Sequence, residues 1–90
     1  MTKVVYNACH GGFSLSEAAS LKLGMEFWDT MRMDRHDPAL VEIVETMGAE
    51  ANGSYAELRI AEIEGDRYII REYDGREWVE TPEMVRWVVV

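Results

Sequence analysis

Apolar and polar residues follow two different periods along this chain, a helical one in the first half and an alternating one in the second. Residues 3–8 are rich in β-branched and aromatic side chains and predict a first strand. Ser14 stands three positions before Glu17, and this capping-box spacing predicts the start of a helix that ends at Gly24. The chain is therefore expected to open with a strand followed by a helix.

Two further segments complete the first half of the chain. Residues 25–35 are apolar without a clear period, and they fit a second short helix or an irregular apolar flap equally well. Asp37 followed by Pro38 is typical of a helix N-cap and first helical position, and apolar residues then recur at helical spacing up to Gly48. We therefore expect two or three short helices.

The second half of the chain alternates in the manner of strands, with turn signals at residues 64–66, 74–75 and 81–82. The four predicted strands are residues 55–63, 67–73, 76–80 and 84–90. The last one ends in Val88, Val89 and Val90, an apolar terminus that is expected to lie inside a sheet or a dimer interface. The predicted fold class is α+β: an N-terminal strand, two or three short helices, and an antiparallel β-meander of about four strands packed on the helices.

The composition indicates one folded domain that covers residues 1–90. Apolar residues make up 48% and charged residues 29% of the chain, as in globular proteins. Nine basic residues against 17 acidic ones give a net charge of −8, which disfavours binding to nucleic acid or to an anionic membrane. The single cysteine, Cys9, excludes an intramolecular disulfide, and no apolar run is long enough for a signal peptide or a membrane span. These features predict a cytoplasmic protein.

The candidate reactive residues do not form a familiar catalytic or metal-binding pattern. Cys9 and His10 are neighbours in a strand-like segment, where adjacent side chains point to opposite faces. His36 follows His10 by 26 positions, a spacing that does not match a metal site. Acidic and arginine residues interleave along the predicted strands, which favours a solvated face of mixed charge over a cation site. We therefore expect no enzymatic activity, no metal and no cofactor.

The loop from Gly11 to Ser14 supports two compatible interpretations. In the first, the glycines supply a turn with positive φ and Phe13 packs as a hydrophobic staple before the helix. In the second, the N–H groups after Gly12 form a cradle for a phosphate or a carboxylate, supplemented by the side chains of Asn7, Ser14 or Ser16.

Three segments resemble a family of small proteins common in bacteriophage genomes: residues 4–16, residues 37–42 and residues 72–79. Those proteins typically open with Val-Val-Ile-Asn-x-Cys-x-Gly-Gly-Phe-x-Leu-Ser and close near Glu-Tyr-Asp-Gly-x-Glu-x-Val. This chain departs from them at His10, where an aromatic residue is usual. It also carries Val85-Arg86-Trp87 where relatives often have His-Arg ahead of a tryptophan.

The resemblance implies a viral accessory protein that counters host immunity. The expected mechanism is sequestration of a nucleotide-derived immune signal, of the cyclic ADP-ribose or cyclic oligonucleotide type, by a homo-oligomer in the host cytoplasm and without catalysis. The site residues expected for this role are Asn7, Gly11, Gly12, Phe13, Ser14, Arg71, Tyr73, Trp78, Arg86 and Trp87. One alternative is an acidic inhibitor that binds a host defence protein directly. Another is a small enzyme that uses Cys9 or the glycine loop.

Overall fold

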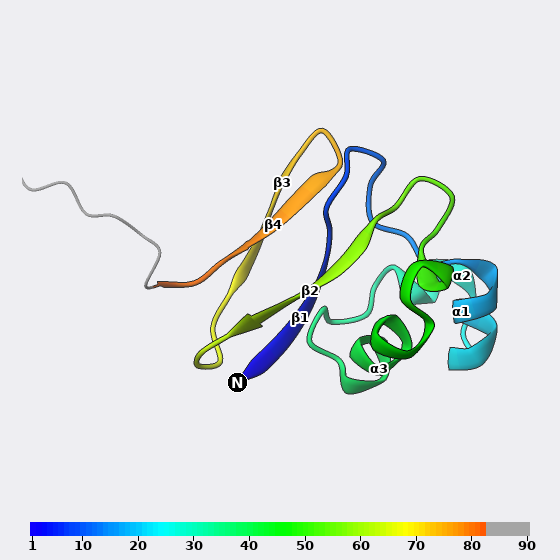
Figure 1. Ribbon diagram of the computed structural model, residues 1–90, viewed down its shortest axis with the longest axis horizontal. Coiled ribbons are helices and arrows are strands. Elements are labelled where there is room, and N and C mark those ends of the chain that lie inside the picture. Colours follow the sequence, from blue (N-terminus) through cyan, green and yellow to red (C-terminus); the bar gives the residue numbers. More distant parts are fainter. Residues whose placement is uncertain (83–90) are drawn as a thin grey trace, which may run out of the picture.

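A computed structural model describes residues 1–82 of the 90-residue chain. It confirms the α+β class: an N-terminal strand, short helices, and antiparallel strands (Figure 1). The elements, in chain order, are β1 (Thr2–Asn7), α1 (Glu17–Leu23), α2 (Phe27–Thr30), α3 (Pro38–Met47), the 3-10 helix η1 (Gly48–Ala51), β2 (Leu58–Ile63), β3 (Ile69–Tyr73) and β4 (Arg76–Glu80).

The strands pair as two separate two-stranded sheets, not as one continuous meander. β1 pairs with β2 in antiparallel register, so that Val5 lies opposite Ile60, and β3 pairs with β4. β2 takes β1 as its partner because β1 supplies the fully buried Val5, on which the helices pack. In Figure 1 the β3–β4 hairpin stands beside β1, on the side away from the helices. The predicted strand at 84–90 lies outside the described residues.

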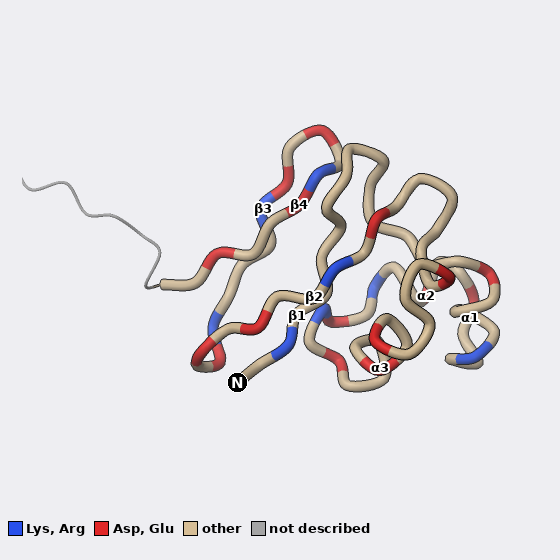
Figure 2. The backbone as a smooth tube through the Cα atoms, in the orientation of Figure 1, with Lys and Arg blue, Asp and Glu red and all other residues tan. Residues whose placement is uncertain are grey.

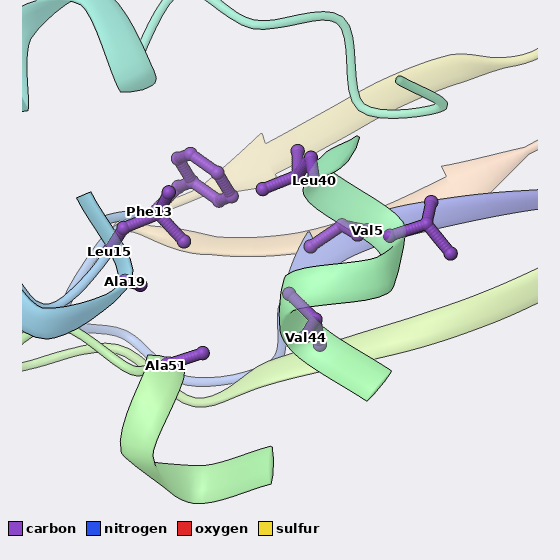
Figure 3. Close-up of a cluster of buried hydrophobic side chains, with 8 residues drawn as sticks. Val5, Phe13, Leu15, Ala19, Leu40, Val44 and Ala51 are labelled. Atoms are coloured by element: carbon purple, nitrogen blue, oxygen red, sulfur yellow. The ribbon is translucent and has the colours of Figure 1, made fainter. Parts of the chain in front are cut away.

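The core forms where α3 packs on β1. Asp37 caps α3 by accepting a hydrogen bond from the backbone N–H of Ala39 at 2.9 Å, and Pro38 occupies the first turn, as predicted. Figure 3 shows Leu40 and Val44 of this helix beside Val5. The same cluster includes Phe13, Leu15, Ala19, Val41 and Ala51. Burial of this apolar stripe orients α3 and fixes the loop that carries Phe13.

The start of α1 was predicted two residues too early. Ser16, not Ser14, is its N-cap, and its Oγ accepts a hydrogen bond from the N–H of Ala19 at 3.1 Å. The helix begins later because Leu15 forms an antiparallel bridge with Asn52, which keeps the chain extended there. Its end is confirmed at Gly24, where φ is 67°.

The remaining boundaries differ from the sequence pattern where loop contacts replace regular pairing. Residues 25–35 combine both expected forms, since one helical turn, α2, is followed by an irregular segment. β2 begins at Leu58 instead of residue 55, because the N–H of Ala56 donates to the carbonyl of Gly53 in a turn. β3 begins at Ile69 instead of residue 67. In residues 1–82, no helix has both the length and the apolar character that a membrane span requires.

Candidate functional site

The glycine loop and the tip of the β3–β4 hairpin pack directly against each other. Asp74 and Gly75 form the tight turn between the strands, with φ values of 51° and 88°. A Cβ atom on Gly75 would lie 2.3 Å from the carbonyl oxygen of His10. The absence of a side chain at Gly75 is therefore what allows the two loops to meet.

Asn7 ties this junction together from within. Its side chain is fully buried, and its Nδ2 donates to the carbonyl oxygens of Cys9 at 2.7 Å and Gly75 at 2.9 Å. Its Oδ1 accepts a hydrogen bond from the N–H of Glu57 at 2.8 Å. The Asn7 amide thus holds three loops in place, and both of its donor hydrogens are used by the protein.

A buried ion pair that the sequence analysis missed connects the hairpin to β1. The Arg35 guanidinium donates to both carboxylate oxygens of Glu77, at 2.6 and 2.9 Å. Glu77 also accepts the backbone N–H of Asn7 at 2.9 Å, and the carbonyl of Arg35 accepts the N–H of Val5 at 2.8 Å. These contacts close the edge of β1 that faces the hairpin.

Only one weak sequence signal pointed to this pair. Strand alternation in β4 places Glu77 on the same face as Val79, so a carboxylate stands on the side that also carries an apolar residue. Arg35 gave no signal, because it follows an aperiodic segment. The pairing spans 42 positions of sequence.

A cavity of about 520 Å³ opens at this junction. Gly11, Gly12 and Phe13 line one side, and Ile70, Glu72 and Glu77 of the hairpin line the other. The Arg35 guanidinium carbon lies 3.6 Å from the centre of the buried Phe13 ring, within cation–π range. The structure therefore brings three of the predicted site residues together with the inward face of the hairpin.

The charges around this cavity do not favour an anion. Among residues 1–82, Arg35 is the only cation that lines it, and Glu77 binds that guanidinium through both oxygens. Glu72 adds a second carboxylate, which accepts the N–H of Gly75 at 2.7 Å. α1 begins only at Glu17, so its N-terminus does not follow directly on the glycine turn. The phosphate interpretation of the loop stays a prediction, and the local charge does not support it.

Other predicted residues lie on the opposite face of the hairpin. Cross-strand pairing places Arg71 beside Trp78, Tyr73 beside Arg76 and Ile69 beside Glu80. These six residues form the outward hairpin face, and Figure 2 shows both basic and acidic positions along the hairpin. Tyr73 is 72% exposed and Trp78 is 41% exposed. Arg71 and Trp78 are therefore separated from the glycine loop by the thickness of the hairpin.

Glu80 organises part of the outward hairpin face. One of its carboxylate oxygens accepts the indole N–H of Trp78 at 3.0 Å, and the other accepts the Nε–H of Arg71 at 3.1 Å. Hydrogen bonds from Trp78 and Arg71 hold the pKa of Glu80 below its usual range. The indole of Trp78 is thereby oriented on an exposed surface.

The remaining predicted residues occupy other places. Ser14 lines a separate groove between α1, α2 and residues 52–55. Arg86 and Trp87 lie outside the described residues. Cys9 and His10 have different partners, since the Cys9 thiol donates to the carbonyl of Tyr55 at 2.9 Å while the His10 ring contacts the carbonyl of Asp74 at 3.3 Å. Across residues 1–82 there is no cluster of three metal-ligating side chains.

Comparison with protein-family models, with curated proteins and with solved structures finds no match to this chain. The proposed function therefore rests on the geometry of the described residues.

Proposed function

We propose that this chain is a non-enzymatic binding protein that inhibits another protein by docking through the outward hairpin face. The observation that carries the proposal is the exposed group formed by Tyr73, Arg76 and Trp78 on one side of the hairpin. Tyrosine, arginine and tryptophan are the residue types that contribute most often to binding energy in protein interfaces.

The hairpin also has the rigidity that a binding surface needs. The inward side of β4 is held by the Arg35–Glu77 pair, and the turn is held by the hydrogen bond from Asn7 to Gly75. A surface that is already ordered loses little conformational entropy on binding. The net charge of −8 further favours encounter with a basic partner.

The resemblance to small bacteriophage proteins indicates the class of partner. Among the functions that this resemblance implies, direct binding to a host defence protein in the host cytoplasm fits the outward hairpin face. The residues described around the cavity beside the glycine loop include no unpaired cation, which makes it less suited to a phosphate-bearing signal. We therefore place the protein-binding role ahead of sequestration.

Affinity capture from bacterial host extract tests this proposal. Trp78→Ala should lower the amount of captured partner by tenfold or more, on the order of what the loss of an interface hot spot causes. Glu42→Ala is the control, because Glu42 is exposed on α3, away from the hairpin. Equal capture by both variants and the unaltered protein would contradict the assigned surface, and circular dichroism verifies that each variant is folded.

Sequestration of a nucleotide-derived ligand remains the second proposal, because the glycine loop and the hairpin do border one cavity of about 520 Å³. A homo-oligomer could complete that cavity with residues from a second copy. Calorimetry against cyclic dinucleotides and cyclic ADP-ribose isomers tests this role. Heat of binding that Phe13→Ala abolishes would support it, and the absence of heat with every compound would exclude these ligand classes.

A further inference from the structure

A second hollow lies at the other end of the molecule from the hairpin. It is a cavity of about 740 Å³ between α1, α2 and the loop that follows η1, and we name it the α1–α2 groove. Figure 1 shows α1 and α2 side by side at this end. The residues that matter for its chemistry are Glu17, Leu21, Glu26, Phe27 and Tyr55. Ser14 is the one residue that it shares with the loop from Gly11 to Ser14, and the outward hairpin face does not contribute to it.

The walls of the α1–α2 groove are exposed and aromatic. Tyr55 is 78% exposed and Phe27 is 41% exposed, although both side chains border a concave surface. Phe27 is held by an edge-to-face contact with Trp28, with ring centres 5.2 Å apart. Leu21 adds an exposed aliphatic wall. Exposed apolar side chains that gather around a hollow are typical of a binding site.

The charged side chains described in the lining of this groove are all acidic. Glu17 and Glu26 both line it, and within residues 1–82 no lysine, arginine or histidine does. Glu26 occupies the N-cap of α2, yet its side chain makes no capping hydrogen bond. Neither carboxylate takes part in any of the four ion pairs formed within residues 1–82. Their negative charge is therefore available to a ligand.

We propose that the α1–α2 groove binds a cationic side chain, arginine or lysine, presented by the partner protein. The carboxylates of Glu17 and Glu26 would accept hydrogen bonds from the charged head group. The rings of Phe27 and Tyr55 attract a cation through their π faces, and Leu21 contacts its aliphatic stem. This inference rests on the proposed function in one respect, namely that the occupant belongs to a protein.

A nucleotide is a poorer occupant of the same groove. Its phosphates would approach two carboxylates, and the described part of the lining holds no compensating cation. Capping of α1 by an acidic residue in its first turn accounts for Glu17 alone, since Glu26 makes no capping bond. The combination of unpaired carboxylates and aromatic walls is therefore better explained by a cationic ligand.

Titration of the ¹⁵N-labelled full chain with N-acetyl-argininamide tests the inference by nuclear magnetic resonance. We expect saturable shifts of the amide signals of Glu17, Phe27 and Tyr55 at low ionic strength. N-acetyl-citrullinamide, which has nearly the same shape without the charge, should give no saturation. Saturation by the citrulline compound at equal concentration, saturation by adenosine monophosphate instead, or no saturable shift with argininamide would each overturn the inference.

Matched variants locate the binding. Glu26→Gln should weaken argininamide binding about two- to fivefold, as expected for one exposed ion pair. Glu64→Gln is the control, because Glu64 is also exposed but lies in the turn after β2, outside the groove. Tyr55→Ala should weaken binding by a similar factor through the lost cation–π contact, about two- to fivefold. Equal effects of Glu26→Gln and Glu64→Gln would show a general charge effect and overturn the site.

The outcome is separable from that of the capture experiment. Argininamide binding reports only on the α1–α2 groove and needs no partner protein. If argininamide binds but Trp78→Ala captures as much partner as the unaltered protein, the outward hairpin face is not the docking surface, and the cation site in the α1–α2 groove is still supported. If argininamide does not bind and Trp78→Ala loses the partner, the α1–α2 groove is not a cation site, and the proposed function is still supported.

Discussion

The Arg35–Glu77 pair is the interaction on which the candidate site depends most. Its two side chains are only 17% and 9% exposed, it is bidentate, and Glu77 also accepts a backbone N–H from Asn7. A buried pair of this kind stabilises little relative to well-packed apolar residues. Removing one partner, however, leaves a buried charge without compensation.

Glu77→Gln should therefore destabilise the protein strongly, by about 3 to 5 kcal/mol in the free energy of unfolding. The substitution keeps the shape of the side chain and an acceptor for Asn7, but it leaves the Arg35 charge unpaired. Urea unfolding measures the change. Glu64→Gln is the control, and as an exposed substitution it should change stability by less than about 0.5 kcal/mol. Equal effects of the two variants would mean that the buried pair is energetically unimportant.

The β3–β4 hairpin depends on contacts at both of its ends. Its turn meets the glycine loop through Gly75, and its outward face is ordered by the bonds of Glu80 to Trp78 and Arg71. An isolated two-stranded hairpin is at best marginally stable in water. These contacts therefore decide whether the outward hairpin face keeps its shape.

Gly75→Ala and Gly65→Ala form a matched pair that isolates the contact with the loop. Both glycines have positive φ, 88° and 82°, so alanine is strained at either site. Only at Gly75 would the new Cβ also collide with the carbonyl of His10. We expect Gly65→Ala to cost about 1 to 2 kcal/mol and Gly75→Ala clearly more, measured by urea unfolding. Equal losses would show that the hairpin tip does not need this close approach.

The titration of Glu80 gives a pH-dependent test of the outward hairpin face. Hydrogen bonds from Trp78 and Arg71 lower its pKa, so the ionised carboxylate stabilises the folded hairpin above the usual glutamate pKa. This contribution is lost as the pH falls through the lowered pKa. The indole N–H resonance of Trp78 should shift with a midpoint below the usual glutamate pKa. Glu80→Gln should abolish the shift, whereas a midpoint at or above the usual value would contradict the hydrogen bonds.

Net charge acts on the molecule as a whole. Seventeen acidic and nine basic residues give a net charge of −8. Repulsion among the excess negative charges destabilises the compact folded state. The exposed ion pairs, such as Lys3 with Glu45, oppose this effect only weakly because solvent and salt screen them.

Added salt should therefore stabilise the protein. Raising sodium chloride from ~0.01 M to ~0.15 M shortens the screening length from ~30 Å to ~8 Å, which weakens the self-repulsion. The urea midpoint is expected to rise. Potassium chloride at the same ionic strength should give the same increase, since the cause is screening and not binding of one ion. A lower midpoint at higher salt would show that the surface ion pairs outweigh the repulsion.

The sequence predicted the helices and strands of this protein better than the way in which they pair and pack. Asp37 with Pro38, Gly24, and the Asp74-Gly75 turn were all recognised, because capping and turn formation involve the backbone within a few residues. The start of α1 was misplaced, because the bridge from Leu15 to Asn52 crosses 37 positions of sequence. No pattern within a few residues of sequence predicts such a long-range contact.

The composition and local patterns of the chain were sufficient to establish its α+β class and an excess of negative charge, because these properties depend on residue types and short-range spacing. The partner of each strand, the burial of Arg35 against Glu77, and the separation of the predicted residues of the glycine loop from those on the outward hairpin face emerged only in the folded chain. These features arise from contacts between residues far apart in sequence. Their formation depends on which surfaces pack best in three dimensions, and no single segment of the chain contains that information.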